Sequence, residues 1–287
     1  MMSIPVAVDL VIKLGGSAIT EKSQPETFKE AAIRESVKLV KLCVNKGLKV
    51  VVVHGAGSFG HQQAKEYKVT GGWMRDSGGS QVNYGFSLTR VSCMKLNAKV
   101  VEQLTDEGLP AVGLSPCGNW TTQDGKVVQS GVSAVSSFLG AGFVPVLHGD
   151  CVLDTVTGCT ILSGDTVIKT LCKELAVGKV VFLTDVAGIY DKPPQVPGAK
   201  LIPNIRVDEN GKIVQQITTD ALSCDVTGGI ELKLSSAVEI VLQSKGTVPV
   251  FICQVGSKAA ENICIGGEQL AVFEEGVTWL LRVNSVQ

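Results

Sequence analysis

Short apolar runs alternate along the chain with longer stretches in which apolar and polar residues recur at helical spacing. Val6–Leu14 is almost continuously apolar, which is typical of a strand covered on both faces of a parallel sheet. Thr27–Lys46 instead places Ile33, Val37 and Val40 on one side and charged residues on the other, which predicts an amphipathic helix. This pattern therefore predicts that the chain begins with a buried strand, followed by a helix that covers it.

The same alternation continues toward the C-terminus. A long helix is predicted over Ser80–Glu107, and other helix-like segments are interleaved with short apolar runs. The further strands expected are Leu48–Val53, Leu109–Leu114, Phe143–Leu147, Lys179–Thr184 and Thr247–Cys253. Strands that alternate with helices indicate an α/β protein with a mostly parallel central sheet and helices on both faces, that is, a three-layer αβα sandwich.

Turn signals interrupt this alternation in the middle of the chain. Trp120–Gln129 contains Asp-Gly and Asp150–Ile161 contains Thr-Gly, so each segment is predicted to form a β-hairpin. The prolines of Pro193–Pro203 predict a loop. We expect one continuous sheet that includes these hairpins.

The domain organisation follows from length and from the absence of linker-like sequence. Residues 1–287 contain no low-complexity segment and no short repeat, so a single domain is expected. Two lobes should meet near Leu175–Lys179, with an N-terminal lobe of about residues 1–175 and a C-terminal lobe of about residues 176–287.

Composition narrows the class of protein. Hydrophobic residues make up 45% of the chain and charged residues 18%, which indicates a buried globular core. The net charge of −1 gives no broad basic surface, so neither nucleic acid nor membrane is an expected partner. The apolar start, Ile4–Leu14, reads as a strand and not as a signal peptide. Nine scattered cysteines fit buried thiols in a reducing compartment, so a cytoplasmic protein is expected and no metal site is predicted.

Unusual residues follow several of the predicted strands. In open α/β sheets, ligands bind beyond the carboxyl ends of the parallel strands. Two of these strand ends are rich in glycine, Lys13–Ser17 and His54–His61. The other groups are His148-Gly149-Asp150, Ser163-Gly164-Asp165, Thr184–Gly188 and, at the start of a later helix, Thr227-Gly228-Gly229 with Lys233. Glycines let backbone N–H groups approach an anion, so these strand ends suggest phosphate binding by local groups.

The two glycine loops differ in how specific they are. Lys13, Gly15, Gly16 and Ser17, with Lys22 further on, could bind phosphate, but a plain strand-to-helix turn with solvated lysines explains this loop equally well. In the second loop a helical pattern begins near Ser58, and a helix N-terminus is a natural phosphate seat.

The histidines and aspartates of these strand ends have alternative roles. His61 lies in the first turn of that predicted helix and is expected to face the same seat, whereas His54 and His148 are expected to hold loops through hydrogen bonds. Asp165 could pair with the lysines or cap a helix, and Asp185 could contact a nucleotide or its metal.

Lys233 is one helical turn beyond Gly229, so its amine could reach the same phosphate, although a surface lysine is an alternative.

Several well-known catalytic motifs are absent from the sequence. It contains no P-loop, no protein-kinase catalytic-loop motif and no Gly-x-Ser-x-Gly elbow. If this chain binds phosphate, it therefore does so without any of these three motifs.

The order of these motifs resembles the amino acid kinase superfamily, from Leu10 to about Val255. The motifs are Lys-x-Gly-Gly-Ser, a following lysine, His-Gly-x-Gly-Ser, Ser-Gly-Asp, Thr-Asp-Val-x-Gly and Asp-Val-Thr-Gly-Gly with a downstream lysine. Within that superfamily, His54–His61 is similar to the corresponding loop of isopentenyl phosphate kinases, and fosfomycin kinases are also similar. Ala56 departs from the pattern, because many members have glycine there.

The resemblance implies a role for each matching residue. The ATP-binding residues would be Lys13, Gly15, Gly16, Ser17, Gly57, Asp185, Gly229 and Lys233. Lys22 would stabilise the transferring phosphoryl group, and Asp165 would organise the lysines. Ala56 and Gly164 would contact the acceptor, and His61 would hold its phosphate. The amino acid kinase fold is the fold implied, with an acceptor-binding N-terminal lobe and a nucleotide-binding C-terminal lobe.

The activity implied is transfer of the γ-phosphoryl group from ATP, with Mg²⁺, to isopentenyl phosphate for isoprenoid precursor synthesis by a homodimer. Two alternatives stay open at this point: a kinase of the same fold that acts on fosfomycin or another alkyl phosphate, and a non-catalytic nucleotide sensor. The presence of Lys13, Lys22, Lys233 and Asp165 together argues against the sensor. A phosphate acceptor is already anionic near neutral pH, so no general base is expected.

An apolar pocket should accommodate the acceptor's hydrocarbon tail beside the second loop. The segment Gln81–Leu96 could form its wall, with Tyr84, Phe86 and Met94 as candidate lining residues. Each of these side chains could equally be an ordinary core residue.

Overall fold

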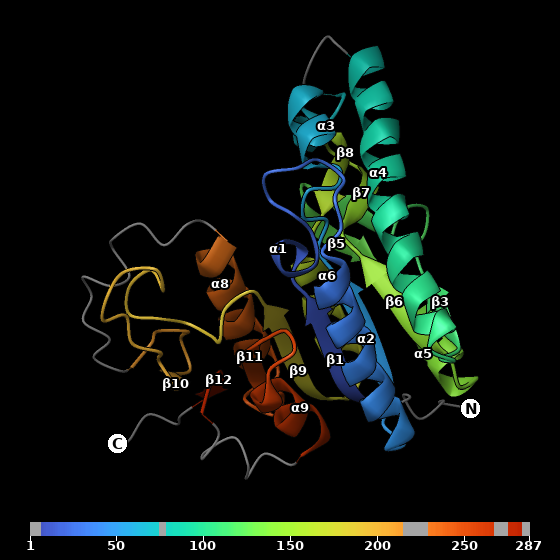
Figure 1. Ribbon diagram of the computed structural model, residues 1–287. Coiled ribbons are helices and arrows are strands. Elements are labelled where there is room, and N and C mark those ends of the chain that lie inside the picture. The colour runs from blue at the N-terminus through green and yellow to red at the C-terminus, as the bar shows by residue number, and fades with distance from the viewer. Residues whose placement is uncertain (1–6, 75–78, 215–228, 267–274, 283–287) are drawn as a thin grey trace.

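The computed structural model describes residues 7–74, 79–214, 229–266 and 275–282. In this part of the chain an eight-stranded sheet has the strand order β10-β12-β11-β9-β1-β2-β6-β3 (Figure 1). Its strands are β1 (Val8–Leu14), β2 (Val50–His54), β3 (Ala111–Gly113), β6 (Val144–His148), β9 (Val177–Thr184), β10 (Asn204–Val207), β11 (Val250–Gln254) and β12 (Val277–Arg282). Neighbouring strands are parallel except β11 and β12, which are antiparallel.

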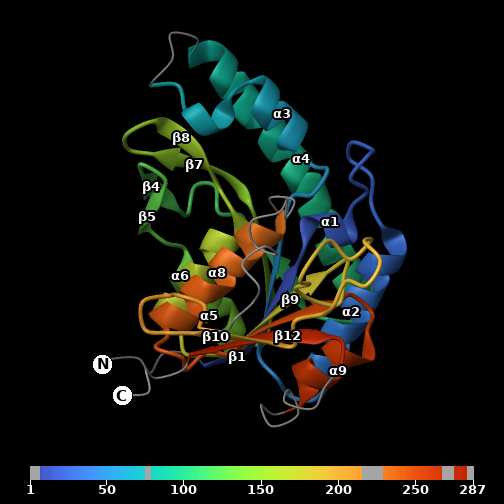
Figure 2. The ribbon, with the colours of Figure 1, turned by 90° about the vertical axis from the view of Figure 1, so that its left-hand side faces the viewer.

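Helices cover both faces of this sheet, as Figure 2 shows. One face is covered by α2 (Glu30–Asn45), α4 (Gly79–Asp106) and α9 (Lys258–Ile265), and the other by α5 (Val132–Gly140), α6 (Gly164–Glu174) and α8 (Gly229–Gln243). Successive strand residues point to opposite faces, so Leu10 and Ile12 of β1 enter the core under α2 while Val11 enters the core under α6. The predicted three-layer αβα sandwich is confirmed.

The hairpins do not extend the main sheet, so the expectation of one continuous sheet was wrong. Four strands, β4 (Thr121–Gln123), β5 (Lys126–Gln129), β7 (Asp150–Asp154) and β8 (Gly158–Leu162), form a separate sheet in the order β5-β4-β7-β8. This sheet covers a small core of its own with the short helices α3 (His61–Glu66) and η1 (Val69–Gly71). Cys151 and Cys159 are buried in this small core, whereas Val152 and Leu162, on the other face of β7 and β8, pack in the core under α6.

Predicted and observed elements otherwise agree closely along the N-terminal three quarters of the chain. Strands β2 and β6 each continue one residue further than expected, through His54 and His148. Strands β10 and β12 were missed, because β10 is only four residues long and pairs with β12 at the edge of the sheet. A short edge strand carries little alternation from which it could be predicted.

The turn between β7 and β8 is held by a single buried carboxylate. Asp154 is 2% exposed, and its oxygens accept hydrogen bonds from the backbone N–H groups of Gly125, Val156 and Thr157 and from the hydroxyl of Thr122. Burial opposes ionisation of Asp154, but these donors outweigh it and hold its pKa well below the ordinary value. The carboxylate thus joins both hairpins of the small sheet.

Replacing Asp154 by asparagine should lower the free energy of unfolding by about 2–3 kcal/mol, because an amide would face backbone donors that the carboxylate now satisfies. A lowered folded-state pKa stabilises the fold above the unfolded-state pKa, about 3.9, and that contribution is lost as the pH falls. Urea unfolding should therefore show the full difference in free energy of unfolding between the wild type and Asp154→Asn at pH 7. This difference should become smaller below about pH 4.

The exposed substitution Asp106→Asn makes the same change of charge on α4 and should alter stability by less than about 0.5 kcal/mol. An equal effect of the two substitutions would show that the hydrogen bonds of Asp154 are not the cause.

Candidate functional site

The centre of the site is a buried lysine on the central strand β1. Lys13 lies on the same face of the sheet as Val11, and it is 6% exposed. Its ammonium group is bonded to the carboxylate of Asp165 at the start of α6, and it lies 5.5 Å from the centre of the Phe182 ring. A buried ammonium requires such a partner, so this pair fixes the lysine beneath the loops that follow β1 and β2.

The two glycine loops pack directly against each other, backbone to backbone. A Cβ atom on Gly16 would lie 2.3 Å from the backbone nitrogen of Gly57, so no side chain fits at Gly16. Gly57 has a φ of +57°, and a Cβ there would lie 2.0 Å from the hydroxyl oxygen of Thr20. The sequence requires glycine at both positions because only bare backbones approach this closely.

This packing leaves a group of amide N–H groups for a ligand. Among the described residues, the N–H groups of Gly16, Ser17, Ala56 and Gly57 have no protein acceptor, whereas that of Gly55 donates to Leu14. Successive free N–H groups in tight loops form a concave seat for anions. An alanine side chain at position 56 leaves its N–H unaffected, so the departure from the family pattern preserves this seat.

His54 and His148 hold the loops from below, as the sequence suggested. Nδ1 of His54 donates to the carbonyl of Gly55 at 3.1 Å, and Nδ1 of His148 donates to that of Gly149 at 2.9 Å. Burial, together with the neighbouring His148 ring, lowers the pKa of His54 to about 3, and burial also lowers the pKa of His148. The two stacked rings, 5.4 Å apart, are therefore neutral and act as supports for the backbone.

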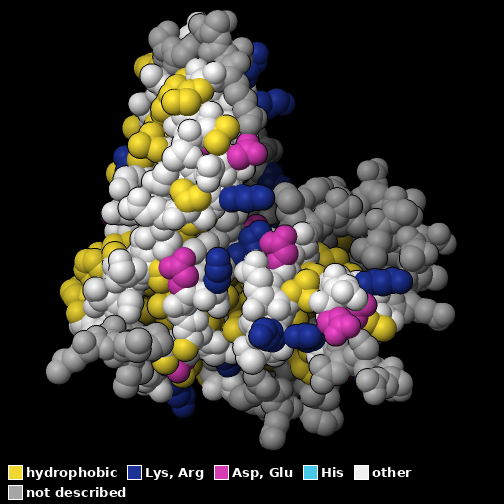
Figure 3. All heavy atoms as spheres, turned by 180° about the vertical axis from the view of Figure 1, so that it is seen from behind, with side chains coloured by type: hydrophobic (Ala, Val, Ile, Leu, Met, Phe, Trp, Pro, Cys, Tyr) yellow, Lys and Arg dark blue, Asp and Glu magenta, His cyan; other side chains and the backbone are white. Residues whose placement is uncertain are grey.

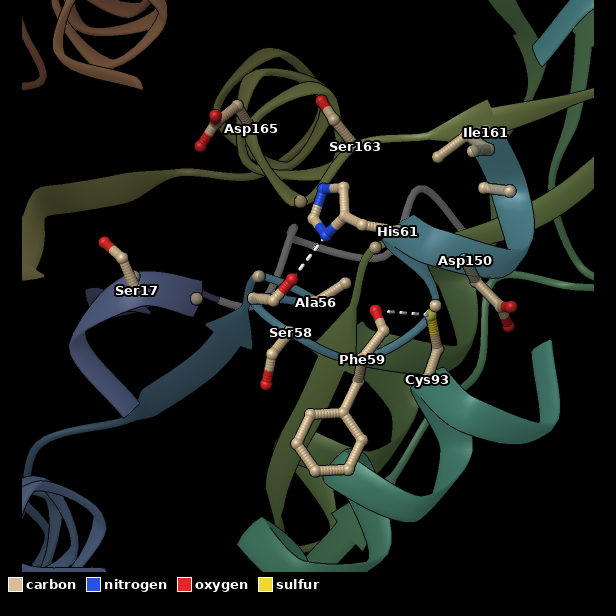
Figure 4. A pocket seen from close by; sticks show the side chains of 18 of the residues that line it. Ser17, Ala56, Ser58, Phe59, His61, Cys93, Asp150, Ile161, Ser163 and Asp165 are labelled. Atoms are coloured by element: carbon tan, nitrogen blue, oxygen red, sulfur yellow. Dashed lines mark hydrogen bonds between the residues drawn. The ribbon is translucent and has the colours of Figure 1, made fainter. Parts of the chain in front are cut away.

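His61 lies on the other side of the second loop. Helix α3 begins at His61 and not near Ser58, and it has only six residues, so the loop amides and not a long helix make the phosphate seat. Nδ1 of His61 donates to the carbonyl of Gly57, because a carbonyl oxygen can only accept. Figure 4 shows the ring between the Ala56 loop and the start of α6, where Nε2 remains available to a ligand.

The start of α6 forms the opposite wall of the site (Figure 4). The N-cap of α6 is Ser163, whose hydroxyl accepts from Thr166, so Asp165 is not the cap that the sequence allowed and instead pairs with Lys13. Gly164 faces the carbonyl of His54, from which a Cβ would be only 3.1 Å away. Gly164 thus lets α6 approach both the loop and the lysine.

Three lysines, Lys13, Lys22 and Lys233, lie near two aspartates, Asp165 and Asp185, at the site. The amine of Lys22 lies 3.2 Å from a carboxylate oxygen of Asp185, and the side chain of Lys22 is 70% exposed. Burial opposes ionisation of Asp185, but Lys22, backbone and Lys233 lower its pKa. Burial lowers the pKa of Lys233 despite Asp185 and Asp165 nearby. This arrangement concentrates positive charge that a polyphosphate could neutralise.

These elements enclose a cavity of about 440 Å³. Its lining includes most of the residues predicted from the sequence: Lys13, Gly15, Gly16, Ser17, Lys22, Ala56, Gly57, His61, Gly164, Asp165 and Lys233. Asp185 does not line the cavity but pairs with Lys22, which does. Gly229 is the first residue of α8, the helix that carries Lys233. The predicted residues are therefore brought together around one cavity.

One end of the cavity is apolar, and the predicted segment Gln81–Leu96 forms part of its wall, but not through the side chains that were expected. Tyr84 and Met94 point to solvent with 59% and 44% exposure, and Phe86 packs in the core under the small sheet, so all three were wrong as lining residues. Thr89 and Cys93 line the cavity from the same helix. They are four residues apart and share a face of α4. Phe86 lies on this face one turn earlier, where it packs in the small core, whereas Tyr84 and Met94 lie on other faces.

The remaining apolar lining comes from segments that are distant in sequence. Phe59 and Ala64 follow the second loop, and Ile161 belongs to β8. The carboxylate of Asp150 also borders the cavity, but it points away from His61 and accepts from Ser115 (Figure 4). Asp150 belongs to the predicted strand end His148-Gly149-Asp150, whereas Ile161 was not predicted as a site residue, because its place here depends on the separate sheet.

The charged side chains on one face of the molecule are of mixed sign. On the face seen in Figure 3, lysine and arginine side chains are interspersed with acidic ones and form no continuous basic surface. No helix within the described residues is long and apolar enough to cross a membrane. In the same part of the chain no group of three or more histidine, cysteine or acidic side chains is placed to hold a metal ion.

Comparisons with known proteins place this site among phosphotransferases. A model of the amino acid kinase family matches residues 10–254. The chain is 40% identical over 250 residues to an isopentenyl phosphate kinase of Arabidopsis thaliana, which covers 82% of this chain and 73% of the relative. It is 32% identical over 265 residues to the enzyme of that name from Methanothermobacter thermautotrophicus, over 90% of this chain and 96% of the relative.

A solved structure is similar over almost the whole chain. The crystal structure of the isopentenyl phosphate kinase product complex from T. acidophilum superimposes with a TM-score of 0.72 at 26% identity. The similarity covers 96% of this chain and 100% of that one.

Proposed function

Because the chain belongs to the amino acid kinase family, we propose that it transfers the γ-phosphoryl group of ATP to isopentenyl phosphate, giving isopentenyl diphosphate and ADP. One observation carries the choice of acceptor: His61 and the free amides of Ala56 and Gly57 lie between the lysine cluster and an apolar end of the same cavity. A phosphate monoester with a short hydrocarbon tail matches that order of groups. Isopentenyl phosphate kinases are also among its relatives.

The nucleotide side is assigned to the first loop and the lysines. The amides of Gly16 and Ser17 face the cavity beside Lys13, and Lys22 and Lys233 approach it from the other side. We propose that these groups hold the phosphates of ATP. Gly15, Asp185 and Gly229 would bound the same side, in the lobe of about residues 176–287 and the strand next to it.

The acceptor side is assigned to the second loop. The amide of Ala56 and Nε2 of His61 would hold the acceptor phosphate, with Gly164 against it, while Cys93 and Ile161 contact the tail. Nδ1 of His61 already donates to a carbonyl, which leaves Nε2 for the acceptor phosphate. His61 would therefore position the acceptor by hydrogen bonding or charge, and would not act as a base.

The chemistry requires alignment and charge neutralisation more than proton transfer. An oxygen of the acceptor phosphate attacks Pγ as the bond from Pγ to the β-phosphate oxygen breaks, so one P–O bond forms and one is lost. Lys22 is placed to stabilise charge on the moving group, and Asp165 holds Lys13 in position. Mg²⁺ bound to ATP would neutralise further phosphate charge.

A panel of acceptors tests this function. We expect ATP-dependent ADP release with isopentenyl phosphate, weaker release with dimethylallyl phosphate, and none above the acceptor-free rate with UMP or glutamate. The measurement is coupled ADP release, with the diphosphate product identified by mass spectrometry. Activity on UMP or glutamate alone would contradict the proposal. Activity on fosfomycin alone would instead support the alternative that the chain is a fosfomycin kinase of the same fold.

We further propose that the enzyme acts as a cytoplasmic homodimer.

A further inference from the structure

A buried threonine connects the two glycine loops. Thr20 follows the short helix α1 (Gly16–Ile19) and is fully buried. Its hydroxyl donates to the carbonyl oxygen of Gly16 at 2.8 Å and accepts from the backbone N–H of Ser58 at 2.9 Å. One hydroxyl group thus bonds to the loop assigned to ATP and to the loop assigned to the acceptor.

The peptide that Thr20 contacts is also the one that holds His61. The N–H and C=O groups of a trans peptide point in opposite directions. In the peptide between Gly57 and Ser58, the N–H points to Thr20 and the C=O accepts from Nδ1 of His61. The hydrogen bonds therefore run in series from the carbonyl of Gly16, through Thr20 and this peptide, to the imidazole ring.

We propose that Thr20 is a positioning residue, which sets the distance between the two loops and, through the Gly57–Ser58 peptide, the orientation of His61. The inference rests on the proposed function in so far as His61 holds the acceptor phosphate. It differs from that function because Thr20 does not line the cavity and touches no substrate.

Glycine loops need such a constraint. Gly57 is in the left-handed region, with φ of +57°, and it packs against the carbonyl of Gly16, so this position of the loop has no side chain of its own to fix it. Transfer in line requires both phosphates within a narrow range of distance and angle. Donation from His61 to the Gly57 carbonyl also polarises the peptide and strengthens the bond from Ser58 to Thr20. Thr20 and His61 should therefore depend on each other.

Two substitutions separate the hydroxyl from the shape of the side chain. Thr20→Val keeps the shape and removes both hydrogen bonds, and it should raise the KM for isopentenyl phosphate about 10-fold and lower kcat about 10-fold. Thr20→Ser keeps the hydroxyl and should stay within about 3-fold of the wild type in both constants. If Thr20→Ser were as impaired as Thr20→Val, the hydroxyl would not be the group that matters and the proposal would fail.

A double-mutant cycle with His61 distinguishes positioning from general structural support. Once His61 is alanine, Thr20→Val has no ring to misplace, so it should change the acceptor KM by less than about 2-fold. The same 10-fold effect in both backgrounds would overturn the proposal, because Thr20 would then act independently of His61.

A measurement on the wild-type protein needs neither activity nor a folded variant. The amide of Ser58 should exchange with deuterium much more slowly than the free loop amides of Ala56 and Gly57. Equal exchange rates would remove the bond on which the proposal depends. If the wild type phosphorylated none of the panel acceptors but this amide were protected, the proposed function would fail while the connection through Thr20 would stand.

Discussion

Replacing Lys22 by alanine should lower kcat by about 10²–10³-fold, with the KM for both substrates changed by less than about 3-fold. The reason is the position of its amine. The side chain is 70% exposed and, within the described residues, forms an ion pair with Asp185 at 3.2 Å, so it is free to follow a phosphoryl group as charge develops on it. An interaction made chiefly in the transition state affects kcat and not substrate binding.

Steady-state kinetics with ATP and isopentenyl phosphate measure this effect. Lys38→Ala is a matched control, because Lys38 is an exposed lysine on α2 that pairs with Glu35 far from the cavity, and its removal should leave kcat unchanged. Lys22→Arg should recover part of the loss, since it retains the charge. A near-normal kcat for Lys22→Ala would remove Lys22 from the transition state.

Lys13 differs from Lys22 although both belong to the first loop region. Lys13 is buried and bonded to Asp165, so its charge is fixed before any ligand binds. A buried pair of this kind is costly to break and contributes order more than net stability. The site therefore combines a rigid ammonium group, that of Lys13, beneath the loops with a mobile one, that of Lys22, above them. The rigid group suits binding of phosphate, and the mobile group suits transfer of the phosphoryl group.

The residues at the carboxyl ends of the central strands were predictable because the geometry of a parallel sheet brings such ends to one edge. Lys13, the two glycine loops and Asp165 met there as expected. That logic depends only on the strands being parallel, which the alternation of strands and helices already indicates. Pairing of Asp165 with the lysines was one of the two roles that the sequence left open, and the structure shows it with Lys13.

The tail pocket and the bridging hydroxyl could not be predicted in the same way. Ile161 reaches the cavity only because the hairpins form a separate sheet, and Cys93 reaches it because of the rotation of α4 about its axis. Thr20 and Ser58 are 38 residues apart and become partners only when two bare backbones pack together. Periodicity predicts which face of an element is apolar, but not which residues of distant loops will meet.

Replacing His61 by alanine should raise the KM for isopentenyl phosphate about 10–100-fold while the KM for ATP stays within about 2-fold. The lost interaction is a hydrogen bond from an imidazole to an anionic phosphate, and hydrogen bonds to charged groups contribute about 1.5–3 kcal/mol. ATP should be little affected, because its loop, at Gly16 and Ser17, lies on the far side of the Gly57–Ser58 peptide. Initial-rate kinetics with each substrate varied in turn measure both constants.

Two further variants make that result specific to the acceptor phosphate. Gln62→Ala removes the neighbouring exposed side chain on α3 and should leave both constants unchanged. His61→Gln retains a donor and should lose less affinity for isopentenyl phosphate than the alanine variant. If His61→Ala instead raised the KM for ATP as much as that for the acceptor, His61 would belong to the nucleotide side. The order of groups in the cavity, lysines first and imidazole next to the apolar end, would then no longer select a phosphate with a hydrocarbon tail.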